Sequence, residues 1–194
     1  MEKSEILEFA RNLKATEHVI LLYTNSKDKQ LVLFTYLKAG LEKGEAAAYV
    51  TCEETIEQVK QAMRKFSITV EQYEKSGALK VIDYRDWYVI DGKFDMLKTL
   101  GLWKKLLDEA TAKGFKGLRV TGETTCFFEN KMVKELAEYE RALHRILEIP
   151  MTAICAYDSD VAAREGGSDL LLDLLTAHMT AIIMGPRAGV VKTI

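Results

Sequence analysis

The fold of this chain is decided by residues 117–130, which read GLRVTGETTCFFEN. Residues 118–121 have the composition of a short strand, and a segment with helical periodicity begins near Asn130. Between them come Gly122, Glu123 and a group of hydroxyl, thiol and aromatic side chains. In an open parallel sheet, ligands bind outside the carboxyl ends of the strands. We therefore expect a functional site directly after this strand.

Outward from this stretch, strand-like and helix-like segments alternate along the chain. The strands are expected at residues 18–23, 46–51, 79–83, 118–121, 151–157 and 180–184, and the helices at 3–14, 29–42, 53–66, 69–75, 95–113, 131–147 and 169–177. Most connections between strands are long enough to cross over the sheet, which favours right-handed βαβ units. We predict an α/β fold, a three-layer sandwich in which a mostly parallel sheet of five or six strands has helices on both faces.

Three segments fall outside this alternation. Residues 84–94 are aromatic-rich and fit neither period, so we interpret them as an ordered loop. A Gly-Gly pair at 166–167 is expected to break the chain before Ser168 caps the next helix, and residues 187–194 are expected to form a loose tail. With only two prolines and no linker, residues 1–194 are interpreted as one domain with a core of about 15–185.

Composition limits the function classes. Hydrophobic residues make up 48% and charged residues 29%, which is typical of a globular protein rather than a disordered one. The 27 basic and 29 acidic residues form no basic stripe, so direct nucleic-acid binding is not expected. No apolar run reaches the roughly 18 residues of a membrane span. Three cysteines without a CxxC pair indicate free thiols in a reducing cytoplasm, so we predict a cytoplasmic protein without membrane attachment.

The first strand-to-helix turn lacks the residues of a phosphate loop. It runs from Tyr23 to Lys29 without a glycine, and neither GxxxxGK[ST] nor GxGxxG occurs in the chain. Without glycines the backbone amides cannot readily close around a phosphate chain. ATP hydrolysis and dinucleotide chemistry are therefore disfavoured, and no cofactor is predicted.

The single polar side chains admit a functional and a structural interpretation. Glu123 has the position of a general base, but a carboxylate bonded to loop amides, or one that contacts a ligand, fits as well. The histidines, His18 included, are interpreted as structural hydrogen-bonding groups. Cys52, Cys126 and Cys155 are expected near strand ends, where soft-metal binding competes with simple burial. Their spacing matches no zinc motif, so we favour burial and predict no metal and no catalytic residue.

The aromatic loop also has two interpretations. Trp87 and its neighbours can wall an apolar pocket, with polar groups such as Asp83 fixing a ligand. Alternatively, Trp87 and Phe94 only pin the loop to the core. The sequence does not separate the two.

Several segments together resemble the MEDS domain, the methanogen/methylotroph sensory domain first named from regulators of the dichloromethane response. They span roughly residues 15–185, and they are HVILLY at 18–23, DWYVIDGKFD at 86–95, GFKGLRVTGE at 114–123, YE at 139–140 and CAYD at 155–158. The GFKGLRVTGE string followed by an acidic helix is the most specific of these.

The resemblance implies a RecA/KaiC-like core without a phosphate loop that senses hydrocarbon derivatives or similar small molecules in archaea or bacteria. Family members are often joined to DNA-binding, kinase or anti-sigma-type domains, so this chain would signal through a separate protein, a kinase or a transcription regulator. RecA-like cores commonly self-associate, which is compatible with a homodimer. The motif residues that the resemblance carries over are His18, Tyr23, Trp87, Tyr88, Arg119, Thr121, Glu123 and Asp158.

We therefore predict a non-enzymatic, cytoplasmic sensor of a small, partly apolar ligand. Apart from His18, which is kept as a family-motif residue, the predicted ligand-binding residues are Tyr23, Cys52, Asp83, Trp87, Tyr88, Arg119, Thr121, Glu123 and Asp158. The alternative is a degenerate RecA/KaiC-like nucleotide binder or ATPase without a Walker A loop, in which Glu123 orients water. A third hypothesis is a structural interaction module whose crevice is filled by side chains.

Overall fold

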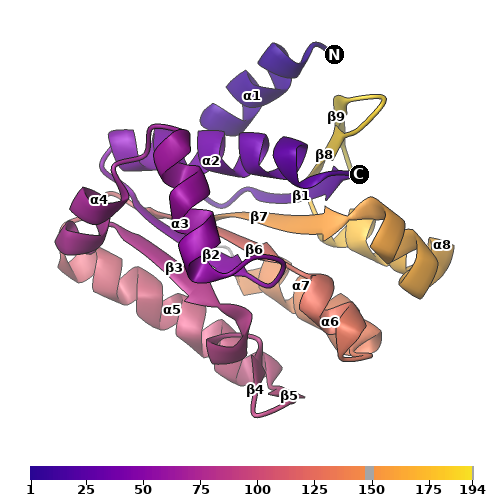
Figure 1. The fold of residues 1–194 in the computed structure, drawn as a ribbon. Helices are drawn as coiled ribbons and strands as arrows, with labels where there is room; N and C mark the ends of the chain where they lie inside the picture. The colour runs from indigo at the N-terminus through magenta and orange to yellow at the C-terminus, as the bar shows by residue number, and fades with distance from the viewer. Residues whose placement is uncertain (147–150, 194) are drawn as a thin grey trace.

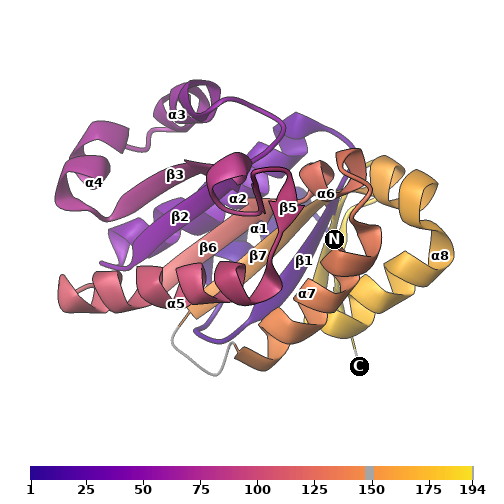
Figure 2. The ribbon, with the colours of Figure 1, turned by 90° about the horizontal axis from the view of Figure 1, so that it is seen from below.

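A computed structural model describes residues 1–146 and 151–193 of the chain. A central sheet lies between two layers of helices, with α2 on one face and α5 and α7 on the other (Figure 1). Seen from below, α5 and α7 lie across the strands of the sheet (Figure 2). The predicted three-layer α/β architecture is confirmed.

The elements follow one another in the predicted alternation. The strands are β1 (His18–Tyr23), β2 (Ala46–Thr51), β3 (Leu79–Asp83), β4 (Val89–Ile90), β5 (Lys93–Phe94), β6 (Leu118–Glu123), β7 (Met151–Asp158), β8 (Thr180–Met184) and β9 (Gly189–Lys192). The helices are α1 (Lys3–Arg11), α2 (Ser26–Glu42), α3 (Ile56–Lys65), α4 (Val70–Ser76), α5 (Met96–Ala112), α6 (Thr125–Glu129), α7 (Val133–Ile146) and α8 (Ser159–Ala177), with a 3₁₀ turn at Tyr84–Asp86.

The main sheet has seven strands in the order β3-β2-β6-β7-β1-β8-β9. All neighbouring pairs are parallel except β8 and β9. The central strands β1, β2 and β6 are almost wholly buried, as expected of parallel strands that are covered on both faces.

Successive side chains of each strand enter opposite layers. On β1, Val19 and Leu21 belong to the core that residues of α1, α2, α3 and α4 share, whereas Ile20 belongs to the core that residues of α5, α6, α7 and α8 share. The sheet therefore separates two hydrophobic cores, and a polar side chain near a strand end faces one of them according to its position. This alternation decides which of the predicted site residues can meet.

The segment after Asp158 differs from the prediction because this side chain caps a helix. Its carboxylate accepts hydrogen bonds from the backbone N–H groups of Asp160 and Val161, each at 3.0 Å, and α8 begins directly after it. Gly167, with φ of 66° and ψ of −165°, is non-helical and divides α8 into two helical pieces. The expected break at 166–167 is therefore confirmed.

Two further segments are more regular than predicted. Residues 189–192 of the expected loose tail form β9, which adds to the open edge of β8 with Val190 opposite Ile182, and this makes the sheet larger than five or six strands. Within the aromatic segment, β4 and β5 form a small hairpin around Asp91 and Gly92, whose φ angles are 52° and 72°. An Asp-Gly pair with two positive φ values is typical of a tight hairpin turn.

Every helix in the described part of the chain is too short or too polar to cross a bilayer.

Candidate functional site

The carboxyl ends of the parallel strands form one edge of the sheet. The register places Thr51 beside Asp83, Val50 beside Gly122 and Tyr23 beside Asp158, and the chain leaves β2 directly into Cys52. The predicted site residues at strand ends therefore lie along a common edge. This edge is where an open parallel sheet binds ligands.

Glu123 is the most completely bonded side chain of this edge. It is fully buried, and its carboxylate accepts hydrogen bonds from the backbone N–H groups of Cys52 and Glu53, both at 2.8 Å. The hydroxyl groups of Tyr49 at 2.6 Å and Thr51 at 3.2 Å donate to it as well. The structural interpretation of Glu123, as a carboxylate bonded to loop amides, is confirmed.

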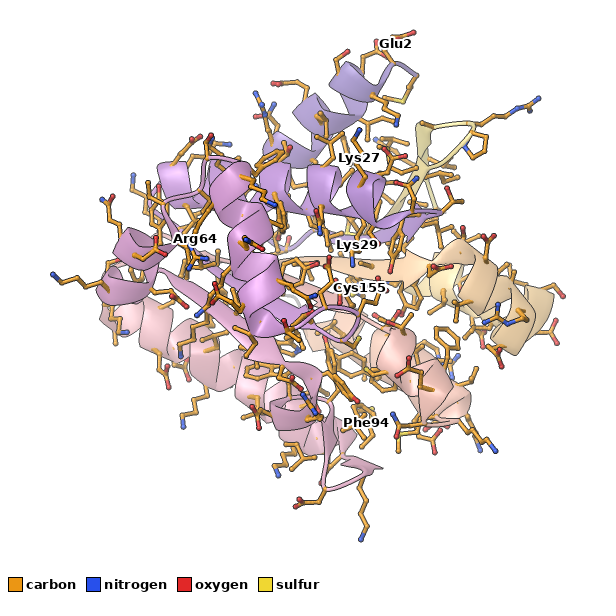
Figure 3. All side chains as sticks on the ribbon, viewed as in Figure 1. Glu2, Lys27, Lys29, Arg64, Phe94 and Cys155 are labelled. Atoms are coloured by element: carbon orange, nitrogen blue, oxygen red, sulfur yellow. The ribbon has the colours of Figure 1, made fainter. Side chains whose placement is uncertain are left out.

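Lys29 supplies the positive charge that the buried carboxylate needs. Its Nζ lies 2.6 Å from Glu123, 2.8 Å from Glu53 and 3.4 Å from Glu54, and its side chain is fully shielded from solvent. Burial alone would lower the pKa of Lys29, but the attraction of Glu123 and Glu53 outweighs it and raises the pKa above its usual value. Lys29 is therefore held as a cation among three carboxylates. Figure 3 shows Lys29 near the middle of the molecule, whereas Lys27 of the same helix points outward.

Glu53 connects this ion cluster to two further elements. Its Oε1 accepts hydrogen bonds from the hydroxyl of Tyr23 on β1 and, at 3.1 Å, from that of Thr125 on α6. Burial and the negative charge of Glu53 raise the pKa of the Tyr23 hydroxyl well above its usual value, so this hydroxyl stays protonated. A group that displaced Glu53 would thus disturb β1, α2 and α6 together.

A cleft of about 460 Å³ opens over the ends of β2 and β3 beside this cluster. Its lining consists of Thr51, Cys52, Glu53, Glu54, Thr55, Ile56, Glu57, Gln58, Asp83, Tyr84 and Arg85. Four carboxylates therefore face one guanidinium, and Arg85 is itself paired with Asp83 at 2.7 Å. The cleft combines an acidic rim with the apolar side chains of Ile56 and Tyr84, and it contains the predicted residues Cys52 and Asp83.

The aromatic segment packs on the core, which agrees with the interpretation that Trp87 and Phe94 pin the loop. Trp87 and Tyr88 are 8% and 5% exposed and belong to the core on the α5 face. Trp87 packs edge-on against Trp103 with ring centroids 4.5 Å apart, and Tyr88 packs against Phe127 at 5.3 Å. Glu123 faces α2 on the opposite side of the sheet, so Trp87 does not cover Glu123. A separate pocket of about 270 Å³ lies at the hairpin, lined in part by Trp87 and Ile90.

Two predicted ligand residues are buried and bonded to other protein groups. Arg119 lies near the amino end of β6, where it pairs with Glu45 at 2.5 Å and donates to the carbonyl oxygens of Tyr36 and Leu13. Thr121 donates to the carbonyl oxygen of Ile154 at 2.8 Å. Neither side chain reaches the cleft. Asp158 reaches the sheet edge but serves there as the helix cap described above.

The three thiols do not converge. Cys52 is half-buried, and burial together with neighbouring Cys126 raises the pKa of its thiol. Cys126 is fully buried, which agrees with the burial interpretation. Cys155 lies inside β7 rather than at its end, and its Sγ is 3.3 Å from Nε2 of His18, the first residue of β1. Because His18 is the first residue of β1, it lies at the end of the sheet opposite the cleft.

Sequence reasoning missed most of the ion cluster. Lys29 was read only as the first residue of a helix, and Glu53 and Glu54 were read only as the start of the next one. A signal was present, because both segments come shortly after a strand, and Glu123 is the last residue of another. What the sequence does not show is that α2 turns Lys29 toward the ends of β2 and β6.

Comparison with known proteins supports the fold and identifies a family. The family model of the MEthanogen/methylotroph, DcmR Sensory domain, abbreviated MEDS, matches residues 17–179. Among solved structures, a KaiC-like protein from the hyperthermophilic archaeon Pyrococcus horikoshii OT3 is similar with a TM-score of 0.62 and 18% identity, over 91% of this chain and 77% of that chain. A search of curated proteins finds no match. The structural likeness, at this identity, concerns the fold alone.

Proposed function

We propose, from the premise that this chain belongs to the MEDS family of sensory domains, that it senses a small organic molecule in the cleft over the ends of β2 and β3. The observation that carries the proposal is the position of this cleft. It lies at the ligand-binding edge of the sheet and borders directly on the Glu123–Lys29 cluster.

The lining of the cleft indicates the chemical class of the ligand. The carboxylates of Glu53, Glu54, Glu57 and Asp83 favour a positively charged or hydrogen-bond-donating group, and Ile56 and Tyr84 offer an apolar contact. A small amine or alcohol with a short hydrocarbon body fits both features. This ligand class agrees with the small, partly apolar molecule expected from the sequence.

Glu53 provides a route from the cleft to the rest of the domain. It lines the cleft and also bonds Lys29 on α2, Tyr23 on β1 and Thr125 on α6. A ligand that competes for Glu53 would change the partners of Lys29 and so bias the position of α2. We propose that a separate signalling protein, a kinase or a transcription regulator, reads this change. Binding rather than catalysis is proposed because Glu123, the strongest candidate base, is fully engaged by protein groups.

The contacts of Lys29 argue against the alternative of nucleotide binding. Its charge is neutralised by three carboxylates, and the turn before α2 has no glycine with which to wrap a phosphate. The acidic rim of the cleft would further repel a polyphosphate. A titration with Mg-ATP tests this: micromolar binding that Glu123→Gln abolishes would favour the nucleotide alternative over the proposed sensor.

A matched pair of variants tests the proposed site. A panel of small amines and alcohols is screened by thermal shift, and each hit is titrated by calorimetry into wild type, Ile56→Asn and Ile90→Asn. Ile56 lines the cleft and Ile90 lines the hairpin pocket, and both side chains are half-buried. Losing the apolar contact in the cleft is expected to weaken binding about tenfold in Ile56→Asn only. Weakening in Ile90→Asn alone would move the ligand to the hairpin pocket, and a panel without a hit would overturn the proposal.

A further inference from the structure

A second group of polar side chains lies in the core on the α5 and α7 face, away from the cleft. We call it the His–Cys–Glu cluster, and it consists of His18, Glu140, Cys155 and His178. One nitrogen, oxygen or sulfur atom from each member lies within 4.8 Å of those of all the others. All four residues are buried, and they come from β1, α7, β7 and the end of α8.

The hydrogen bonds of the two histidines fix which ring nitrogen faces the cluster. Nδ1 of His18 lies 3.2 Å from the carbonyl oxygen of Ala177, and Nδ1 of His178 lies 2.6 Å from that of Leu174. A carbonyl oxygen only accepts, so each Nδ1 carries a hydrogen. In the neutral imidazoles, both Nε2 atoms therefore present a lone pair.

Both Nε2 atoms lie close to other members of the cluster. Oε2 of Glu140 lies 3.3 Å from Nε2 of His18 and 3.5 Å from Nε2 of His178, and Nε2 of His18 lies 3.3 Å from Sγ of Cys155. A buried carboxylate is costly unless a positive charge compensates it. One divalent cation at the centre would supply this charge and contact all four side chains at once.

We propose that the His–Cys–Glu cluster binds one divalent transition-metal ion, for which zinc is the best match. Zinc is bound by nitrogen, sulfur and carboxylate oxygen, and tetrahedral bonds of about 2.0–2.3 Å place the ligand atoms roughly 3.3–3.8 Å apart. Three of the separations between cluster atoms, at 3.3, 3.3 and 3.5 Å, agree with this geometry, and the remaining pairs lie within 4.8 Å.

The surroundings of the cluster also match those of a metal site. Histidine ligands of metals almost always donate their other ring N–H to a carbonyl or carboxylate, as both histidines do here. The other oxygen of Glu140 accepts a hydrogen bond from the hydroxyl of Tyr157, which orients the carboxylate. A bound ion would join α7 and the end of α8 to the adjacent strands β1 and β7.

Metal content and a spectroscopic probe test the proposal. The full chain is unfolded with chelator and refolded with Zn²⁺ or Co²⁺, because the buried cluster is expected to fill most readily during folding. One zinc per chain by mass spectrometry of the metal, and a higher melting temperature than after refolding with chelator, are expected. Refolding with Co²⁺ is expected to give the thiolate-to-cobalt charge-transfer band and the visible spectrum of a tetrahedral site. Refolded protein that retains no metal, or whose melting temperature zinc leaves unchanged, would overturn the proposal.

Two cysteine variants localise the ion. Cys155→Ser is expected to lose the charge-transfer band, whereas Cys126→Ser removes an equally buried thiol outside the cluster and is expected to keep it. A band that survives in Cys155→Ser and disappears in Cys126→Ser would place the metal elsewhere and refute the assignment. Should Cys155→Ser not fold, the stoichiometry and the spectrum of the wild-type protein still decide whether metal binds. None of these readouts depends on the strand-end cleft.

Discussion

Lys29 and Glu123 form an ion pair with Nζ and Oε1 2.6 Å apart, and neither side chain is exposed to solvent. The two residues are 94 positions apart in the chain, and the pair joins α2 to the carboxyl end of β6. A buried pair of this kind adds little stability relative to apolar residues of similar size, but breaking it leaves an uncompensated charge. Its role is therefore to fix how α2 and the strand ends meet.

Replacing Lys29 with methionine is expected to destabilise the protein by about 3–5 kcal/mol, because the fully buried carboxylate of Glu123 loses its cation. Denaturant unfolding measures the change, and Lys27→Met, at an exposed position of the same helix, is expected to stay within about 0.5 kcal/mol. The double variant Lys29→Met/Glu123→Gln should lose less than the sum of the single changes. Equal stability of the two lysine variants would contradict the prediction.

The order of elements was predictable because the strands are buried on both faces. Such strands appear as short apolar runs between polar segments, and β1, β2, β3, β6, β7 and β8 were all expected within a few residues. The same logic placed Cys52, Asp83, Glu123 and Asp158 at the sheet edge. The short elements β4, β5, β9 and α6 and the first half of α8 were not predicted. Of these, β9 follows from edge pairing and the first half of α8 from the Asp158 cap rather than from a long periodic pattern.

The site was less predictable because partners distant in sequence decide it. The side on which Trp87 and Glu123 lie depends on strand alternation and on how the hairpin folds back, and the sequence does not show that the two residues lie on opposite faces of the sheet. The Asp91-Gly92 pair, with two positive φ values, is the local turn signal of this hairpin. The partners of Glu140 and His178 come from four separate elements, so no spacing rule would have found them.

Two helical glycines are expected to respond oppositely to alanine. At Gly40, an added Cβ would lie 2.4 Å from Cδ of Arg119, which is held by Glu45 and by backbone carbonyl groups, so Gly40→Ala should cost about 1–3 kcal/mol. At Gly101, no such neighbour lies within 4 Å, so Gly101→Ala should gain up to about 1 kcal/mol in helix propensity. Urea unfolding of both variants provides the comparison. A stabilised Gly40→Ala would show that Arg119 is not held rigidly.

Gly122 is expected to be required by the ring of Tyr88. A Cβ at Gly122 would lie 2.0 Å from the Tyr88 hydroxyl oxygen and 3.1 Å from Cζ, and the ring is confined by Phe127. Gly122→Ala should therefore lower the melting temperature clearly, and adding Tyr88→Phe should restore part of the loss because the closest atom is removed. Tyr88→Phe alone serves as the control. If the double variant melts no higher than Gly122→Ala, the hydroxyl contact is not the cause.

The contact between α1 and α2 is expected to make a small part of the stability pH-dependent. Nζ of Lys3 lies 2.6 Å from Oδ1 of Asp28, and this hydrogen bond holds the pKa of Asp28 below its usual value. A lowered pKa contributes stability that is present above the unfolded value of about 3.9 and is lost as the pH falls through the folded value. Lys3→Met should therefore cost less than about 1 kcal/mol at neutral pH, since Lys3 is half-exposed, and progressively less in acid. The free energy of unfolding of wild type and variant is measured from pH 7 down to about pH 2, where the carboxyl group of Asp28 is protonated in both the folded and the unfolded state. Lys134→Met, at an exposed position of α7, is the control, and a cost from Lys3→Met that stays constant across this range would rule out the Asp28 linkage.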